Sequence, residues 1–313
     1  MLVIEVAEFG GPDVLRPVQR PDPVAGRGKV LVRVAACDVL FLDTMLRGRA
    51  VEAFPVKLPW VPGNGIAGRL LGGPAEGRAV VAHTGNRGGY AEQAAVLMTE
   101  LTAVPDGVDL DTAAALLHDG PTALALLDRI DVRPGNTVLV VGASGGLGVA
   151  LVQLCRARGI RVVATARGAA KVDRVRALGP AGVLDSGRDD WVEQARALLG
   201  DGADVVLDNV GGDLGTAAFA LVRPGGRFSA HGTPSGRFAT VPRTDITVTG
   251  IEQVQLDPPT MRHYTEQALK QAAAGVLDPI IGQRFALADA AAAHAAIEGR
   301  EVFGKTLLVA DIR

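Results

Sequence analysis

The segment that most constrains the fold runs from Thr137 to Leu151 and reads TVLVVGASGGLGVAL. Its apolar run predicts a buried strand, and the apolar spacing after the glycines predicts a helix. Such a turn binds phosphate because free backbone N–H groups and the positive end of the helix dipole face the anion. Gly145 and Gly146 allow close approach of a pyrophosphate beside Ser144, and Gly148 allows tight helix packing. A purely structural glycine-rich turn is the alternative.

The strand that follows, residues 161–166, ends without an acidic residue. A site specific for NAD usually has an Asp or Glu there, roughly 20 residues beyond the glycines, to bind the ribose 2′-hydroxyl. This chain offers Thr165, Arg167 and Lys171 instead. Charge-assisted bonds from these cations to a 2′-phosphate would favour NADPH as the cofactor. Alternatively, Arg167 and Lys171 form only the solvated start of the next helix.

The rest of the chain predicts two domains, as its length of 313 residues also does. The first third is dense in Gly and Pro and has short alternating strands, which favours a partly closed β lobe. The middle alternates strands and helices, which predicts an α/β doubly wound parallel sheet. Its strands are expected at residues 137–141, 161–166, 182–185, 204–208, 227–231 and 247–250. A helix at 260–274, a second at 289–298 and a strand at 306–309 follow, and we expect this tail to rejoin the first lobe. The predicted domains are therefore residues 1–116 with 257–313, and residues 117–256.

Composition excludes several classes of partner. Lys and Arg (32) nearly cancel Asp and Glu (34), so the chain as a whole has no basic field for nucleic acid. The two cysteines, Cys37 and Cys155, cannot form a disulfide framework, which predicts a reducing compartment. The N-terminus lacks a signal-peptide pattern, and the longest uncharged run is interrupted by the glycine turn. We expect a cytoplasmic protein with no membrane or nucleic-acid partner.

Ligands of open α/β sheets bind at the carboxyl ends of the strands. Asn209 follows the fourth predicted strand, and His231 and Gly232 end or follow the fifth. We therefore place these three residues at the cofactor site.

Seven segments in order resemble the medium-chain dehydrogenase/reductase superfamily, specifically its zinc-independent quinone oxidoreductase branch, which is related to zeta-crystallin. They are DTMLRG (43–48), LPWVPG (58–63), GGYAE (88–92), GPTA (120–123), the turn at 142–148, DNVGG (208–212) and FGKT (303–306). The resemblance implies a GroES-like catalytic domain from the terminal segments and a Rossmann domain from the middle. It also implies NADPH in the cleft and a homodimer. By position it assigns cofactor contacts to Thr122, Leu147, Lys171, Asn209, Gly232, Phe303, Gly304 and Lys305.

The chain departs from the family at several positions. Relatives often have Asn at the place of Leu40, an acidic residue near Gly65 and a Tyr near Ser186. The first two departures leave the substrate end less polar, and the third shifts phosphate recognition to Arg167 and Lys171, with Arg188 as a further contributor. Zinc-dependent relatives draw ligands from places that Leu40 and residues 63–65 (Gly-Asn-Gly) hold here. These side chains cannot ligate zinc, so we expect no metal.

Without a metal, hydride transfer to an electron-poor carbon needs orientation and a place for negative charge on the acceptor oxygen. A quinone or conjugated enone delocalises that charge itself, and a proton can arrive from water. No acid–base pair is evident in the sequence. Candidates for the substrate pocket are Leu40, Asn64, Tyr90 and His118. Tyr90 is expected mainly to pack, His118 is equally well explained as a hinge or cap, and Asp43 and Arg47 are spaced for a helical ion pair.

The leading hypothesis is thus an NADPH-dependent reductase of a quinone or enone. Reduction of an enoyl thioester in lipid or polyketide metabolism is a second hypothesis, disfavoured because its relatives tend to place a Tyr donor near the position of Leu40. An NADPH-binding module with little turnover is a third, since the turn alone does not distinguish it from an enzyme.

Restoring the family residue at position 40 tests whether this position shapes the pocket. We expect Leu40→Asn to change the range of acceptors reduced, because an amide replaces an apolar side chain. Initial rates with a panel of quinones and enones measure this effect. An unchanged rate and acceptor range would contradict the assignment.

Overall fold

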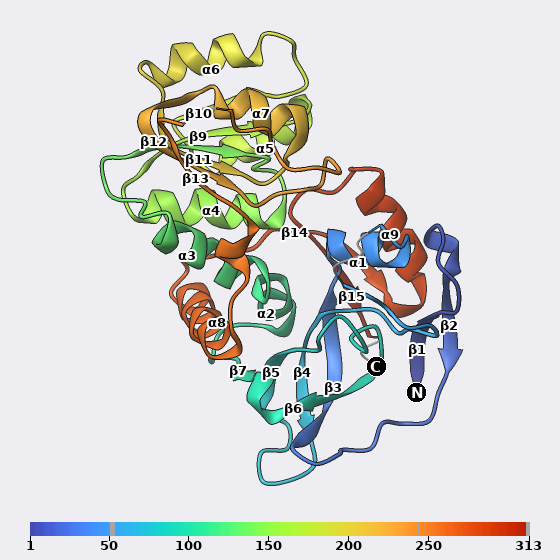
Figure 1. Ribbon diagram of the computed structural model, residues 1–313. Coiled ribbons are helices and arrows are strands. Elements are labelled where there is room, and N and C mark those ends of the chain that lie inside the picture. Colours follow the sequence, from blue (N-terminus) through green and yellow to red (C-terminus); the bar gives the residue numbers. More distant parts are fainter. Residues whose placement is uncertain (51–53, 243, 311–313) are drawn as a thin grey trace. The chain divides into compact units, whose positions relative to one another are not determined.

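The computed structural model describes residues 1–50, 54–242 and 244–310 (Figure 1). They form two compact units. The first comprises the described residues of Met1–His118, Pro258–Ala273 and Pro279–Arg313, and the second comprises those of Asp119–Asp257 and Ala274–Asp278. Residues 274–278 join the second unit, which differs from the predicted boundaries. Two hydrogen bonds explain the difference, because the Gln153 amide donates to the carbonyl of Asp278 (2.8 Å) and accepts from its N–H (3.1 Å).

The second unit is built on a parallel sheet with the strand order β10-β9-β8-β11-β12-β13. The chain runs from β8 to β9 and β10 in one direction and from β11 to β12 and β13 in the other, and helices cover both faces of the sheet (Figure 1). The strands are β8 (Thr137–Val141), β9 (Arg161–Ala166), β10 (Gly182–Asp185), β11 (Ala203–Asp208), β12 (Val222–Ala230) and β13 (Thr247–Thr249). The α-helices are α3 (Asp119–Arg129), α4 (Gly146–Ala157), α5 (Ala169–Ala177), α6 (Trp191–Leu199) and α7 (Gly212–Phe219), and η3 (Ile251–Val254) is a 3₁₀ helix. The predicted doubly wound sheet is confirmed.

The first unit contains a mixed sheet with the order β14-β15-β3-β4-β5-β7, and β6 pairs with β3 outside this path. The pair β1–β2 forms a separate hairpin. The strands are β1 (Leu2–Val6), β2 (Leu15–Gln19), β3 (Lys29–Asp38), β4 (Gly65–Leu71), β5 (Ala79–His83), β6 (Gln93–Leu97), β7 (Leu101–Ala103), β14 (Ile281–Ala286) and β15 (Lys305–Val309). The α-helices are α1 (Phe41–Arg47), α2 (Leu110–Leu116), α8 (Pro258–Ala273) and α9 (Ala290–Glu298). Short 3₁₀ helices are η1 (Pro12–Val14), η2 (Met98–Glu100) and η4 (Leu287–Asp289).

Two elements begin two or more residues before their predicted limits. Strand β12 begins at Val222 rather than at residue 227, because Ala203 of β11 pairs with Val222 before the register shifts. The sequence Pro224-Gly225-Gly226 hides this start, since it reads as a turn. Helix α8 begins at Pro258 rather than at Thr260. Proline is tolerated there because the first N–H groups of a helix have no intrahelical partner.

Strand β3 joins segments that lie far apart in the sequence. It pairs antiparallel with β15 through Leu308↔Cys37 and with β4 through Cys37↔Ile66. The tail of the chain therefore completes the sheet of the first unit. No helix among the described residues is both long enough and apolar enough to span a membrane.

Each unit has its own buried core. The first unit packs Ile4, Val32, Ile66 and their neighbours around its mixed sheet. The second packs Leu139, Val206, Phe228 and others beside the parallel strands. In this unit α4 approaches β8 so closely that a Cβ at Gly148 would lie 2.5 Å from Cα of Ala143 and 2.6 Å from the Gly142 carbonyl oxygen. Only a residue without a side chain fits there.

A matched pair of glycine substitutions tests the close packing at Gly148. We expect Gly148→Ala to destabilise the fold by about 1–3 kcal/mol, because backbone atoms would have to move. Gly145→Ala should change stability by less than about 0.5 kcal/mol, because a Cβ there meets no atom within 4 Å. Urea unfolding measures both values, and equal effects of the two variants would contradict this packing argument.

Candidate functional site

The glycine turn of the second unit is fixed by Thr165 at the end of β9. The Thr165 hydroxyl accepts a hydrogen bond from the Gly142 amide (3.1 Å), and the Thr165 carbonyl accepts one from Ala143 (2.8 Å). The Thr165 side chain is fully buried. This finding corrects the expectation that Thr165 offers its hydroxyl to a ribose phosphate, because the residue instead positions the turn.

The N-terminus of α4 is suited to an anion. Gly145 is the exposed N-cap, no side chain caps the helix, and its first turn has no acidic residue. The N–H groups of a first helical turn lack intrahelical acceptors and carry the positive end of the dipole. Open space beside Gly145 leaves room for a phosphate, and Ser144, Gly146 and Leu147 are half-buried around it. These residues fit the pyrophosphate of a dinucleotide.

Arg167 lies directly beyond β9 and is exposed. Its stem passes Gly187, where a Cβ would be 3.4 Å from Cγ of Arg167. Between them, the Asp185 carboxylate accepts hydrogen bonds from Gly168 N (2.8 Å) and Gly187 N (2.9 Å), which lower its pKa. The two loops are therefore held together at the base of the Arg167 side chain.

The other two predicted phosphate contacts differ from Arg167. Lys171 is half-buried in the first turn of α5. Arg188 is exposed and forms two bonds to Asp190, at 2.9 and 3.1 Å. Arg167 is thus the most open of the three cations to a ligand.

A directional chain of hydrogen bonds lies at the carboxyl ends of β11 and β12. Asn209 donates from its amide to the carbonyl of Val141 (2.8 Å), so its Oδ1 is left to accept from Nε2 of His231 (2.7 Å). Nδ1 of His231 then accepts from the Ser229 hydroxyl (2.8 Å). That hydroxyl accepts in turn from the amide of Gln253 (3.0 Å). The chain fixes the plane of the Asn209 amide beside β8.

Burial keeps His231 neutral. Burial lowers the pKa of this imidazole to about 4, although a hydrogen bond with the backbone of Ser229 opposes the shift. A neutral ring has one donor and one acceptor, as the chain of hydrogen bonds requires. Gly232 is buried behind this group, where a Cβ would lie 2.0 Å from the carbonyl carbon of Asn209. His231 and Gly232 thus hold Asn209 in place, and Gln253 is a member of the group that the sequence did not reveal.

The predicted substrate residues of the first unit differ in burial. Leu40 caps α1 and is half-buried, and Asn64 is half-buried with its Oδ1 accepting from Asn86 N (3.3 Å). Tyr90 is fully buried. Its hydroxyl donates to Asp43 Oδ2 (3.2 Å) and bonds to Nε2 of His294 (2.9 Å). Tyr90 therefore belongs to an internal network and is not exposed to a ligand.

The expected ion pair between Asp43 and Arg47 is wrong. Asp43 Oδ2 accepts from the Leu40 amide (2.9 Å) and from Tyr90, whereas Arg47 forms an ion pair with Glu298 of α9. Tertiary packing of α1 against α9 thus overrides the helical spacing. Burial raises the pKa of Asp43 to about 7, with the Leu40 hydrogen bond opposing and the charge of Asp38 adding to the shift.

His118 belongs to a second buried network, which the sequence did not predict. Its Nδ1 lies 2.7 Å from Oδ2 of Asp38, and Lys305 Nζ lies 3.4 Å from the same oxygen. Asp38 is fully buried and Lys305 is 6% exposed. The ring of His83 packs edge-on against His118, with the ring centroids 4.8 Å apart. Lys305, expected to contact a cofactor, thus has its ammonium group at Asp38.

The remaining predicted cofactor residues are shielded to different degrees. Thr122 on α3 and Gly304 are half-buried, and Phe303 is buried. Among the residues that the structure describes, no three His, Cys, Asp or Glu side chains are grouped to hold a metal ion.

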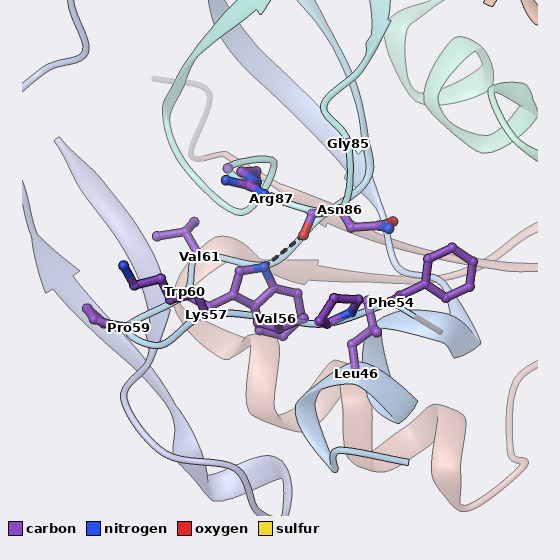
Figure 2. A pocket seen from close by; sticks show the side chains of 12 residues that line it. Leu46, Phe54, Val56, Lys57, Pro59, Trp60, Val61, Gly85, Asn86 and Arg87 are labelled. Carbon is purple, nitrogen blue, oxygen red and sulfur yellow. Dashed lines mark hydrogen bonds between the residues drawn. The ribbon is translucent and has the colours of Figure 1, made fainter. Parts of the chain in front are cut away.

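A pocket of about 420 Å³ lies in the first unit (Figure 2). Trp60 forms part of its wall and donates from its indole to the carbonyl of Asn86 (2.7 Å). Lys57 and Arg87 are the cationic residues among those that line it. None of the predicted substrate candidates lines this pocket, although Asn64 accepts a hydrogen bond from the N–H of Asn86, which does line it.

Comparison with known proteins matches the chain along nearly its whole length. A family model described as zinc-binding dehydrogenase matches residues 146–273. A quinone oxidoreductase of Mus musculus is 32% identical, covering 99% of this chain and 98% of its own. One from Pseudomonas aeruginosa is 30% identical, with 98% of each chain covered. A mycobacterial protein, solved in complex with NADPH, is 30% identical with a TM-score of 0.87 and 99% coverage of both chains.

The chain therefore belongs to the medium-chain dehydrogenase/reductase superfamily, in its quinone oxidoreductase branch. The family predicted from the sequence is confirmed.

Asp43 should make stability depend on pH. Its folded-state pKa of about 7 lies above that of an unfolded Asp, about 4, so the folded state binds more protons between these values. Stability from this residue is present at pH 4 and is lost as the pH rises through 7. We expect Asp43→Asn to remove that loss, which for this pKa shift is on the order of 4 kcal/mol.

Thermal unfolding from pH 4 to pH 8 measures the effect as the difference between the variant and the original chain. The histidines that burial keeps neutral act in the opposite direction, and this difference cancels their contribution. Asp106→Asn, at an exposed turn, is the control. The same pH slope for Asp43→Asn and the original chain would show that Asp43 does not titrate in this range.

Proposed function

We propose that this protein is an NADPH-dependent, zinc-independent reductase that transfers a hydride to a quinone or a conjugated enone. The proposal rests on the N-terminus of α4, which no side chain caps and where open space surrounds Gly145. Arg167 lies directly beyond the neighbouring strand β9. Family membership supports the same activity, because relatives covering the whole chain are named quinone oxidoreductases.

The second unit supplies the residues that would hold NADPH. The turn at Ser144–Gly148 would bind the pyrophosphate, and Arg167 and Lys171 would bind the ribose 2′-phosphate. Asn209, kept in one orientation by His231, lies at the reversal of strand order between β8 and β11, where open α/β sheets bind ligands. When bound, NADPH supplies the hydride.

The first unit supplies the acceptor side in this proposal. Position 40 is Leu and residues 63–65 are Gly-Asn-Gly, so these places offer no zinc ligands. A conjugated acceptor is suited to such a site because it spreads the negative charge that hydride transfer creates. We further propose that the protein acts in the cytoplasm as a homodimer, which sedimentation would test.

Oxidation of NADPH and NADH against quinones, simple enones and an enoyl thioester tests the function. Saturable turnover of a quinone or enone with preference for NADPH is expected. Exclusive turnover of the enoyl thioester would reassign the substrate. Binding of NADPH without turnover of any acceptor would contradict the enzyme assignment.

The preference for NADPH should depend on Arg167. We expect Arg167→Ala to weaken NADPH binding about 10- to 100-fold, which corresponds to loss of one charge-assisted hydrogen bond, and to leave NADH binding nearly unchanged. Arg188→Ala is the matched control, because Arg188 is already paired with Asp190. Fluorescence titration measures both dissociation constants. Equal losses for NADPH and NADH would contradict recognition of the 2′-phosphate by Arg167.

A further inference from the structure

The first unit gathers four titratable side chains at one end of its sheet. Asp38 ends β3, His83 ends β5 and Lys305 begins β15, and His118 follows α2. The sheet sets this arrangement, because Asp38 pairs with Leu307 and His83 pairs with Gly65 of the intervening strand β4. Residues up to 267 positions apart thus meet around one buried carboxylate.

The protonation of this cluster follows from its contacts. Burial alone would raise the pKa of Asp38, but the charges of His118 and Lys305 and their hydrogen bonds bring it below its usual value. Asp38 is therefore a carboxylate that only accepts, and Nδ1 of His118 carries the proton between them. The Nε2 atom of His118 is left to serve a different group.

Three polar atoms of the cluster have no hydrogen-bond partner among the described residues. They are Oδ1 of Asp38, Nε2 of His118 and Nε2 of His83, and all three are buried. An unpaired buried polar group destabilises the fold, so such groups are uncommon unless they serve another purpose. Here the unpaired atoms lie on neighbouring side chains, which indicates that a polar group of a ligand completes their hydrogen bonds.

Gly65 makes this arrangement possible. A Cβ at position 65 would lie 2.6 Å from Cε1 of His118 and 3.0 Å from Oδ1 of Asp38. A side chain there would displace the imidazole or the carboxylate. The carboxylate of this group comes from the adjacent strand β3, where Asp38 bonds to His118.

We propose that His118 is the proton donor of the reduction and that Asp38 is its positioning residue. This inference rests on the proposed function, since it assigns the proton that the reduction of a carbonyl-conjugated acceptor consumes. It makes His118 a catalytic residue and defines the acceptor as one whose oxygen binds at Nε2.

The proton and electrons balance as follows. The acceptor gains a hydride, which carries two electrons, and its π electrons move onto the carbonyl oxygen. The Nε2–H bond of the His118 imidazolium breaks as an O–H bond forms on that oxygen. The imidazole stays protonated at Nδ1, which faces Asp38, and solvent returns a proton to Nε2. An enone gives the saturated ketone through its enol, and a quinone gives the hydroquinone.

The groups that face His118 determine its pH dependence. Asp38 and Lys305 are charged, and burial, followed by the charge of His118, lowers the pKa of His83 to about 3, so His83 stays neutral. Asp43 also interacts with His118 and titrates near pH 7. A wild-type profile therefore contains contributions from both Asp43 and His118, and a variant at position 118 is needed to separate them.

The test uses the full-length protein with His118→Gln, Asp38→Asn and the control His263→Gln, which alters an exposed histidine of α8. For His118→Gln we expect kcat to fall about 100-fold, with the dissociation constant of NADPH unchanged within about twofold. The decline of kcat at high pH that belongs to His118 should disappear. Asp38→Asn should move that decline to lower pH, because the imidazolium loses its carboxylate. His263→Gln should match the original chain.

Nitrogen NMR of the labelled imidazoles gives a readout that is independent of turnover. We expect His118 to keep its proton on Nδ1, facing Asp38, in the original chain, and to lose this tautomer preference in Asp38→Asn. Thermal unfolding checks that each variant is folded. If His118→Gln does not fold, NMR of the original chain and of Asp38→Asn still tests the proposed arrangement.

The outcomes separate this inference from the proposed function. Turnover by the original chain with an unchanged kcat and pH profile in His118→Gln overturns the role of His118 alone. A neutral His118 protonated at Nε2 overturns the role of Asp38 and with it the proposed arrangement. Absence of turnover with every acceptor overturns the proposed function and this inference together.

Discussion

The pairing of β3 with β15 is the constraint on which the first unit depends. Strand β3 contacts β4 and β6 as well as β15, so it joins three parts of the chain into one sheet. Because β15 comes from the tail, the sheet is complete only when the two ends of the chain have met, and closure of so long a loop costs conformational entropy. The same pairing brings Lys305 to Asp38. The desolvation of that buried carboxylate is thereby offset by two cationic partners, which no local segment provides.

In the second unit, side chains rather than strand pairing complete the site. Thr165 holds the glycine turn from below, and the chain from Gln253 to Asn209 holds the end of β11 against β8. Every donor in that chain faces one acceptor, so the orientation of the Asn209 amide is determined without any reference to a ligand. A site built in this way is organised before a cofactor binds, which reduces the entropy that binding must offset.

The sequence predicted five of the six strands of the second unit to within one residue at each end. Strands buried on both faces are continuous apolar runs, as in residues 137–141, and glycine turns mark their ends. The start of β12 was missed because Pro224 and two glycines interrupt its pattern. Local spacing also failed for Arg47, since the competing partner Glu298 comes from a helix 251 positions away.

The residues of the candidate site could be predicted only where they belong to a recognisable sequence motif. The glycine turn and Arg167 follow from position after a strand, whereas Thr165 was misread because the sequence does not show which side of a strand end a side chain occupies. Asp38 belongs to no motif, and its partner His118 lies 80 positions along the chain. Nothing in the sequence relates two such residues until the sheet places them together.

Asp38, His83, His118 and Lys305 form one cluster. Their charges explain why His118 is the member whose protonation can change. Asp38 and Lys305 cancel, and His83 stays neutral, so an imidazolium at His118 is the one net charge among these four side chains. Loss of the Nε2 proton returns the four to neutrality and leaves no buried charge without a partner. A second carboxylate at position 65 would make the neutral-imidazole state a net anion beside a developing oxyanion. The glycine at that position therefore keeps this part of the molecule compatible with negative charge on a bound oxygen.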